Sequence, residues 1–328
     1  MSNCLLEVKD LVTAFTTSKG PLRAVDGVSF QVNSGELIGV VGESGSGKSL
    51  TSLSIMGLVP YPGKVVSGEI FFEGQDLLKL EEAEMVKIRG KNIAMIFQDS
   101  RVSLDPVCRC GEQIVEAIRT HEKATREEAR ERALELIGLV GIPNPARCVN
   151  AYPHELSGGM CQRIMIAIAL SCRPKLLIAD EPTTALDVTV QAQILELLDK
   201  LRHDFDMSVI LITHNLGVVA GVADRIAVMY AGQIMELGDI GEILNHPMHP
   251  YTQGLIKSIP KLEVSSKRLY SISGTVPALD KMPSGCRFEQ RCPEAMALCA
   301  TVLPEMCVLS DGQYVCCHKY DTWRSAYE

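Results

Sequence analysis

The chain has 328 residues, of which 46% are hydrophobic and 22% charged, with a formal net charge of −8. Its length favours two domains, and its acidic balance disfavours a nucleic-acid partner held by a basic surface. The amino terminus lacks the basic and apolar regions of a secretory signal, and the best candidate for a membrane span, residues 207–223, is short and contains polar residues. We therefore expect a cytosolic protein that reaches a membrane only through a partner.

The first elements along the chain are predicted to be strands. Residues 5–15 and 24–32 alternate apolar and polar side chains, which is typical of half-buried strands. The apolar run ELIGVVG, residues 36–42, is typical of a strand covered on both faces, as in parallel sheets. These segments favour an α/β fold with a mostly parallel sheet.

A phosphate-binding loop follows the buried strand. The segment GESGSGKS fits the pattern GxxxxGK[ST] and precedes a helix-compatible run, so a chance glycine-rich turn is disfavoured. The glycines let backbone N–H groups close around phosphate oxygens, Lys48 reaches the β- and γ-phosphates, and Ser49 can bind Mg²⁺. The residues predicted to bind ATP here are Gly42, Glu43, Ser44, Gly45, Ser46, Gly47, Lys48 and Ser49.

Further along, a helix and two buried strands are predicted. Residues 125–139 have apolar side chains at helical spacing, and the segment GIPNPA ends this helix. Residues 176–179 and 209–212 are apolar runs followed by polar residues, the end at which α/β sheets keep their ligands. Asp180 and Glu181 stand at such an end. Asp180 can hold Mg²⁺, and Glu181 can orient or deprotonate the attacking water.

The segment LSGGMCQR, residues 156–163, decides the family. With the motifs above and with TTALD and LITHN after them, it makes the chain resemble the nucleotide-binding subunits of ABC transporters. The resemblance covers residues 1 to about 238. It implies a P-loop NTPase of the ABC cassette type, an α/β domain with a helical subdomain at about residues 99–165.

The resemblance also implies roles for residues outside the phosphate-binding loop. Gln98 corresponds to the glutamine that touches Mg²⁺ and links the site to the membrane subunit, and His214 to the histidine that contacts the γ-phosphate. Asp187 corresponds to an aspartate at the interface of two cassettes and is predicted to contact ATP there. Asn215 departs from the aspartate common at that position, which we expect to matter little. The signature residues expected to bind ATP held by the opposite subunit are Ser157, Gly158 and Gly159.

The implied mechanism is phosphoryl transfer to water, in which Mg²⁺ and Lys48 neutralise developing charge. Phe15 is the candidate for the ring that stacks on adenine, and a core position is its alternative. The predicted catalytic residues are Glu181, His214, Gln98 and Lys48. The predicted Mg²⁺ ligands are Ser49, Gln98 and Asp180.

A soluble ABC-type ATPase acting on nucleic acid or the ribosome is the alternative function. Relatives of that kind carry a coiled coil or zinc module between the glutamine and the signature, or two cassettes in one chain. The stretch between Gln98 and Leu156 is only about 57 residues long, and neither device is present. The sequence therefore favours transport.

The segment from residue 239 to 328 is predicted to be a small cysteine-rich domain. Its motifs HPMHPYTQGLI, GTVP, GCRFEQRCP and CH resemble, in order, the C-terminal extension of ABC importers for oligopeptides, dipeptides and nickel. The resemblance implies an ATPase that powers import across the bacterial inner membrane from its cytoplasmic face. The implied partners are a second cassette, identical or homologous, two transmembrane permease subunits and an external solute-binding protein, without nucleic acid.

Four cysteines in this last segment form a C-x5-C-x6-C-x17-C set. Four thiolates suit zinc or an iron–sulfur cluster, and packing of reduced cysteines is the alternative. The resemblance favours a four-iron four-sulfur cluster over zinc. The fourth ligand is open, because Cys316 could compete with Cys317 and His318 could substitute. The predicted ligands are Cys286, Cys292, Cys299 and Cys317.

Overall fold

The structure is a computed structural model, and it describes residues 4–184, 186–259, 270–309 and 312–321. The described residues form two compact units. The first unit takes residues up to 5, 32–36 and 77–212, and the second takes 6–31, 37–76 and those from 213 onward. The predicted boundary at residue 238 stays a prediction.

The second unit begins with a four-stranded sheet in the order β2-β1-β4-β5. Its strands are β1 (Cys4–Thr17), β2 (Gly20–Asn33), β4 (Gly63–Phe72) and β5 (Gln75–Asp76). Strands β1 and β4 are antiparallel, with Leu6 opposite Phe72. Buried and more exposed residues alternate along β2 from Val28 to Val32, so the predicted half-buried strand is confirmed.

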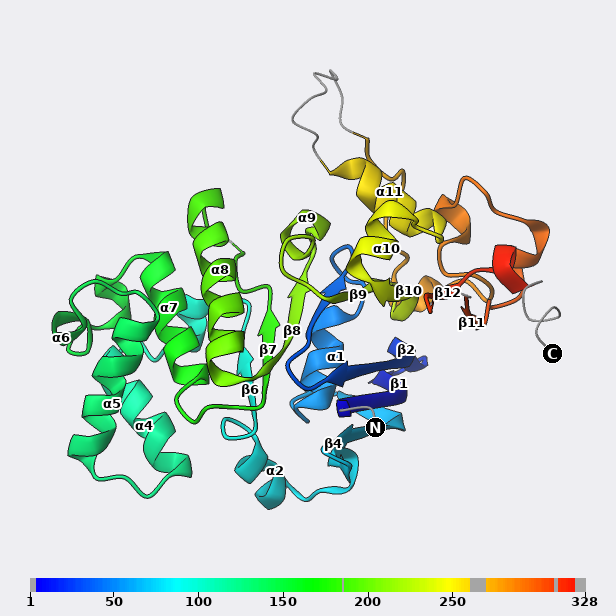
Figure 1. The fold of residues 1–328 in the computed structure, drawn as a ribbon. Helices are drawn as coiled ribbons and strands as arrows, with labels where there is room; N and C mark the ends of the chain where they lie inside the picture. Colours follow the sequence, from blue (N-terminus) through cyan, green and yellow to red (C-terminus); the bar gives the residue numbers. More distant parts are fainter. Residues whose placement is uncertain (1–3, 185, 260–269, 310–311, 322–328) are drawn as a thin grey trace. The chain divides into compact units, whose positions relative to one another are not determined.

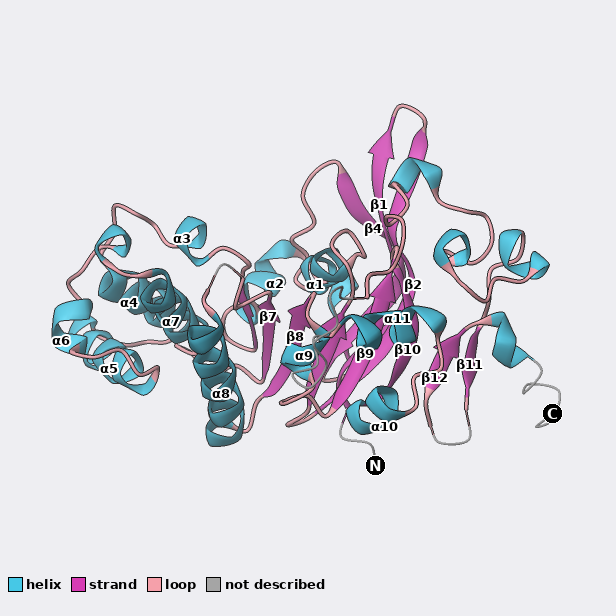
Figure 2. Cartoon of the chain, turned by 90° about the horizontal axis from the view of Figure 1, so that it is seen from above, coloured by secondary structure: helices cyan, strands magenta, loops and turns pink. Residues whose placement is uncertain are grey.

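The second unit also contains a run of mixed strands around β9 (Figure 2). The fully buried β3 is parallel to β9, β9 is antiparallel to β10, and β12 pairs with both β10 and β11. The bounds are β3 (Leu37–Val41), β9 (Arg225–Tyr230), β10 (Gln233–Asp239), β11 (Met306–Val308) and β12 (Tyr314–Cys316). Strands β11 and β12 therefore extend the sheet that carries the phosphate-binding loop.

Short helices complete the second unit. Its α-helices are α1 (Lys48–Ile55), α9 (Leu216–Val219), α10 (Ile240–Asn245) and α11 (Pro250–Ser258). In the described part of this unit, 3₁₀-helices lie at Leu279–Lys281, Glu289–Arg291 and Ala297–Ala300, among others. We call the described residues from Ile240 to Asp321 the C-terminal extension.

The first unit is built on three parallel strands, with β7 between β6 and β8. These are β6 (Ile93–Ile96), β7 (Leu176–Asp180) and β8 (Ser208–Thr213). Every residue of the three strands is buried, which explains their continuous apolar sequence. The strands predicted at residues 176–179 and 209–212 are thus confirmed.

A group of helices forms the other part of the first unit (Figure 1). Helix α7 packs against α3, α4 and α5. The bounds are α3 (Ser100–Ser103), α4 (Cys110–His121), α5 (Arg126–Leu139), α6 (Pro145–Cys148) and α7 (Gly158–Ala169), with a 3₁₀-helix at Pro153–Glu155. The remaining helices of the unit are α2 (Glu82–Ile88), α8 (Val188–Phe205) and a 3₁₀-helix at Leu77–Lys79. The segment predicted to be a helical subdomain thus contains α3 to α6 and most of α7.

None of the helices in the described ranges combines the length and apolar character needed to cross a membrane. The segment 207–223, the candidate span, instead contributes β8 and α9.

Candidate functional site

The phosphate-binding loop connects β3 to α1 and lies against β9. A Cβ built on Gly42 would come within 2.1 Å of the carbonyl oxygen of Met229. Gly47, which precedes α1, has a left-handed φ of 99° that side chains rarely adopt. Glycine is therefore required at both ends of the loop by steric and conformational constraints.

Lys48 is buried with its ammonium group turned back onto this loop. Its Nζ donates to the carbonyl oxygens of Gly42 at 2.8 Å and Glu43 at 3.0 Å, and to Oγ of Ser46 at 3.3 Å. A phosphate group entering the loop would offer this cation a stronger, charge-assisted partner. The arrangement can therefore neutralise phosphate charge, as the sequence predicts.

In the first unit, the structure brings Gln98 and Glu181 together. Nε2 of Gln98 donates to the Glu181 carboxylate at 3.1 Å, and Oγ1 of Thr184 donates to the same carboxylate oxygen at 2.8 Å. The Glu181 backbone is in the left-handed region at φ 46°, and its N–H donates to the Ile212 carbonyl at 2.9 Å. Asp180, the last residue of β7, is buried. The sequence analysis did not predict Thr184, although its position three residues after Glu181 allows it to hydrogen-bond the carboxylate.

Two residues predicted to contact ATP across a cassette dimer are also helix N-caps. Oγ of Ser157 accepts from the N–H of Met160 at the start of α7, and Oδ1 of Asp187 accepts from Val190 at the start of α8. The two helix starts are close, because a Cβ on Gly159 would lie 3.0 Å from Cγ1 of Val190. The exposed N–H groups of a helix start favour anions, which suits a phosphate contact.

Phe15 and His214 lie in the second unit. Phe15 is half-buried on β1 and packs against Gly63, where an added Cβ would meet its ring at 2.7 Å. His214 is exposed after β8. Asn215 caps α9 by accepting from the N–H of Gly217 at 3.0 Å. Asparagine and aspartate cap equally well, so this departure from the family pattern keeps its local structure.

The predicted ligand cysteines lie in the C-terminal extension, where three of them contribute to the pKa of the fourth. Burial and then the neighbouring Cys286, Cys292 and Cys299 raise the pKa of Cys317 to about 11. The backbone N–H of Cys286 donates to the carbonyl of Cys299 at 2.8 Å. Within the described ranges, however, no three His, Cys, Asp or Glu side chains have the spacing of a metal site.

The two competing ligands have other partners. The thiol of Cys316 donates to the carbonyl of Pro304 at 3.2 Å. The ring of His318 forms hydrogen bonds through Nδ1 with the Asp321 carboxylate at 2.5 Å and through Nε2 with the carbonyl of Val302 at 2.8 Å. Cys316 and His318 therefore have hydrogen-bond partners outside the set of predicted ligands.

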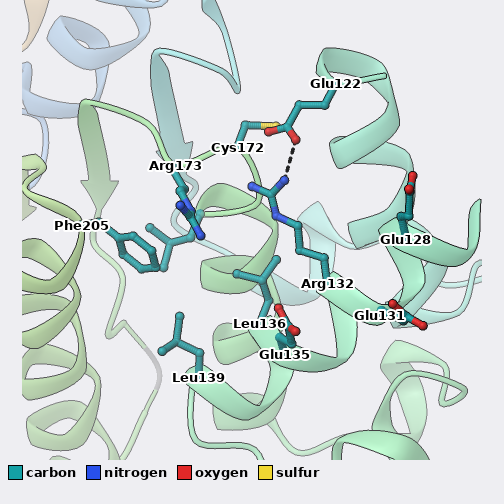
Figure 3. A pocket seen from close by; sticks show the side chains of 11 residues that line it. Glu122, Glu128, Glu131, Arg132, Glu135, Leu136, Leu139, Cys172, Arg173 and Phe205 are labelled. Carbon is teal, nitrogen blue, oxygen red and sulfur yellow. Dashed lines mark hydrogen bonds and ion pairs between the residues drawn. The ribbon is translucent and has the colours of Figure 1, made fainter. Parts of the chain in front are cut away.

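A cavity of about 710 Å³ in the first unit is separate from these residues (Figure 3). Its walls carry an ion pair, in which Arg132 donates to Glu122 at 2.5 Å, and Arg173 lies 5.9 Å from the ring centre of Phe205. The cavity is lined by none of the residues predicted to bind ATP. It is therefore not a candidate nucleotide site.

Comparisons with known proteins identify the family. Residues 25–184 match the ABC transporter family, and residues 235–299 match the C-terminal region of oligopeptide/dipeptide transporters. The oligopeptide transport ATP-binding protein AppD of Bacillus subtilis is 51% identical, over 97% of each chain. The dipeptide transport ATP-binding protein DppD of Escherichia coli is 50% identical, over 96% of each chain. This chain belongs to the oligopeptide/dipeptide family of ABC transporter ATP-binding proteins.

Solved structures agree with this family assignment. The ATP-binding cassette MJ0796, a dimer bound to ADP and Pi after hydrolysis, has a TM-score of 0.65 and 30% identity over 72% of this chain and 98% of its own. The protein cbiO1 of Clostridium perfringens, part of an ABC transporter complex, has a TM-score of 0.64 and 26% identity over 74% of this chain and 92% of its own. The predicted family, the ABC cassette fold and the predicted ATPase class are confirmed.

Proposed function

We propose that this family member is the ATP-hydrolysing subunit of an importer for dipeptides or oligopeptides. The observation that carries the proposal is identity of about one half along nearly the whole chain to relatives named for both kinds of transport. The match of residues 235–299 to the transporters' C-terminal region supports it. The alternative, an ATPase acting on nucleic acid or the ribosome, is not favoured.

The proposal includes the assembly in which such a subunit works. The chain would pair with an identical or homologous cassette and drive two permease subunits at the cytoplasmic face of the bacterial inner membrane. A solute-binding protein outside that membrane would deliver the peptide. The dimeric cassette among the solved relatives supports the pairing.

In hydrolysis, a few residues would neutralise the phosphate charge and one would take the proton of the attacking water. Lys48 and Mg²⁺, held by Ser49, Asp180 and Gln98, would neutralise phosphate charge, and His214 would contact the γ-phosphate. Glu181 would orient and deprotonate the attacking water. Its bonds with Gln98 and Thr184 support this role, because they hold the carboxylate in a defined orientation.

Glu181→Gln tests the proposed function. We expect the variant to bind ATP, to dimerise with it, and to hydrolyse it at least about 100-fold more slowly, because the amide cannot accept the proton of water. Phosphate release and size-exclusion chromatography with ATP measure the two effects. Glu196→Gln, the same change at an exposed position of α8, is the control and should hydrolyse normally. Undiminished turnover in Glu181→Gln would show that another group is the base.

We also propose that Cys286, Cys292, Cys299 and Cys317 hold a four-iron four-sulfur cluster. The support is the chemistry of four thiols, three of which raise the pKa of Cys317, together with the separate partners of Cys316 and His318. Bound, the cluster would cross-link segments of the C-terminal extension.

Metal analysis of protein purified without oxygen tests the cluster. We expect about four irons and four acid-labile sulfides per chain, lost in Cys292→Ser and retained in the control Cys108→Ser. About one zinc per chain would keep a structural metal and exclude the cluster. Protein without metal would refute the site and leave the ATPase proposal standing.

A further inference from the structure

Arg291, in the 3₁₀-helix Glu289–Arg291, forms a two-bond ion pair with the phosphate-binding loop. Its Nη1 and Nη2 donate to the two carboxylate oxygens of Glu43 at 2.5 and 2.9 Å. The Arg291 side chain is only 6% exposed and that of Glu43 is 30% exposed. This planar, two-bond geometry fixes both the position and the orientation of the carboxylate. A residue 248 positions away in sequence thus holds the second residue of the loop.

Every polar group of Glu43 has a partner in this arrangement. Its N–H donates to Oη of Tyr251 at 2.9 Å, and its carbonyl accepts from Lys48 at 3.0 Å. Its carboxylate accepts from Arg291. Two of these three partners come from the C-terminal extension, and the third is the lysine predicted to reach the phosphates. The extension therefore holds the part of the loop against which Lys48 rests.

The two partners from the extension are themselves held firmly. The rings of Tyr230, Tyr251 and Phe288 pack with centroids 4.8 to 5.3 Å apart, and the Arg291 guanidinium lies 5.6 Å from the centre of the Tyr230 ring. Nε of Arg291 donates to the carbonyl of Ser273 at 2.8 Å. Because these groups are ordered by their own packing, they restrain Glu43 without further loss of rotamer freedom.

A second arginine fastens the same segment to the strands behind the loop. Arg287, 9% exposed at its side chain, pairs with Asp26 on β2 and donates to the carbonyl of Ala231 at 3.4 Å. The N–H of Asp26 donates to the carbonyl of Gly232, whose own N–H donates to the loop carbonyl of Ser46. Both ends of the segment from Arg287 to Arg291 are therefore connected to the loop, Arg291 through Glu43 and Arg287 through Asp26 and Gly232.

We infer that Arg291 is a positioning residue for nucleotide binding, which acts through Glu43 to fix the first turn of the phosphate-binding loop. This inference rests on the proposed ATPase function. A loop fixed before the nucleotide arrives loses less conformational freedom on binding, so the ion pair strengthens ATP binding without touching the reacting atoms. The C-terminal extension thereby contributes to the affinity for ATP.

The test compares Arg291→Gln, Glu43→Gln and the double variant in the full chain. Calorimetry with Mg²⁺ and the slowly hydrolysed analogue ATPγS gives the Kd, and phosphate release gives kcat. We expect each single variant to raise the Kd about tenfold, and Arg291→Gln to change kcat at saturating ATP less than about twofold. Because the residues act as a pair, the double variant should bind no more weakly than either single variant.

Two further variants keep the test valid if Arg291→Gln folds poorly. Arg291→Lys keeps the charge but loses the two-bond geometry, so it should raise the Kd about threefold. Tyr251→Phe removes only the hydroxyl that accepts from Glu43, and it should also weaken binding. The matched control is Arg126→Gln, which breaks an exposed pair with Glu112 between α4 and α5 and should leave the Kd unchanged.

Unchanged affinity in folded Arg291→Gln, even with a lower melting temperature, would overturn the inference and assign the pair a purely structural role. Additive losses in the double variant would overturn the action through Glu43. Failure of the unaltered chain to bind ATPγS would instead refute the proposed function itself.

Discussion

Asp187 has a local task at the residue scale, which is separate from the contact with ATP predicted for it. Its Oδ1 accepts from the N–H of Val190 at 2.9 Å and so satisfies one of the donors left open at the start of α8. A cap needs only an oxygen acceptor, whereas a contact across a cassette interface can depend on charge. The two roles can therefore be separated by substitution.

We expect Asp187→Ala to lower the free energy of unfolding by about 1 kcal/mol, and Asp187→Asn to leave it nearly unchanged, because asparagine is an equally good cap. Urea unfolding measures both. Asp204→Ala, at an exposed position near the end of α8, is the control and should have little effect. If the asparagine variant is as unstable as the alanine variant, capping is not what Asp187 contributes. Any loss of ATPase activity in the stable asparagine variant would report on the charge alone.

At the scale of elements, the sequence predicts the helices and strands that local residues determine. It does not predict the strands that pairing with distant residues determines. Helix α5 was predicted within one residue from the helical spacing of its apolar residues and the GIPNPA segment that ends it. Its start is also determined locally: the N–H of Glu128 donates to Oγ1 of Thr125, and the N–H of Thr125 donates to the Glu128 carboxylate. Strands β7 and β8 were predicted because burial on both faces leaves an apolar run. Strands β11 and β12 are three residues each; β12 pairs with the distant β10, and β11 pairs with β12. Such short strands leave no periodic pattern to detect.

The candidate site likewise contains residues that a local motif predicts and residues that only distant contacts bring together. The residues of the phosphate-binding loop could be proposed from the sequence, because phosphate recognition by a backbone loop requires a contiguous motif. The pairing of Gln98 with Glu181 joins separate strand ends, and only the family resemblance placed both near ATP. The ion pair between Glu43 and Arg291 left no signal at all. Its partners are 248 positions apart, and glutamate and arginine are each common on protein surfaces.

At the scale of the whole molecule, His249 connects stability to pH. It is 1% exposed, begins α11 by accepting from the N–H of Tyr251 at 3.0 Å, and lies 5.8 Å from the ring of Phe288. The backbone N–H of His249 donates to the buried carboxylate of Glu236. Burial and then the positive charge of Lys319 lower the pKa of His249 to about 3. The imidazole is therefore neutral in the folded protein at every pH near neutrality.

The direction of the pH effect follows from the unfolded chain, in which the pKa of a histidine is about 6.5. The unfolded state then binds a proton that the folded state excludes until the pH approaches about 3. The stabilisation from His249 is therefore complete above about pH 6.5 and is lost progressively as the pH falls below it, by at most about 1.4 kcal/mol per pH unit. This loss adds to that of every other group that titrates in the range, so only a comparison between variants isolates it.

His249→Asn provides that comparison, because asparagine can cap α11 but does not titrate. Urea unfolding between pH 7.5 and pH 5 should show the original protein losing more stability than the variant, with a difference that grows steadily below about pH 6.5. His203→Asn, at an exposed position of α8, is the control and should follow the original protein. Parallel curves for His249→Asn and the original protein would mean that His249 accepts a proton in the folded state. Burial of its ring against Phe288 would then not exclude the charged form.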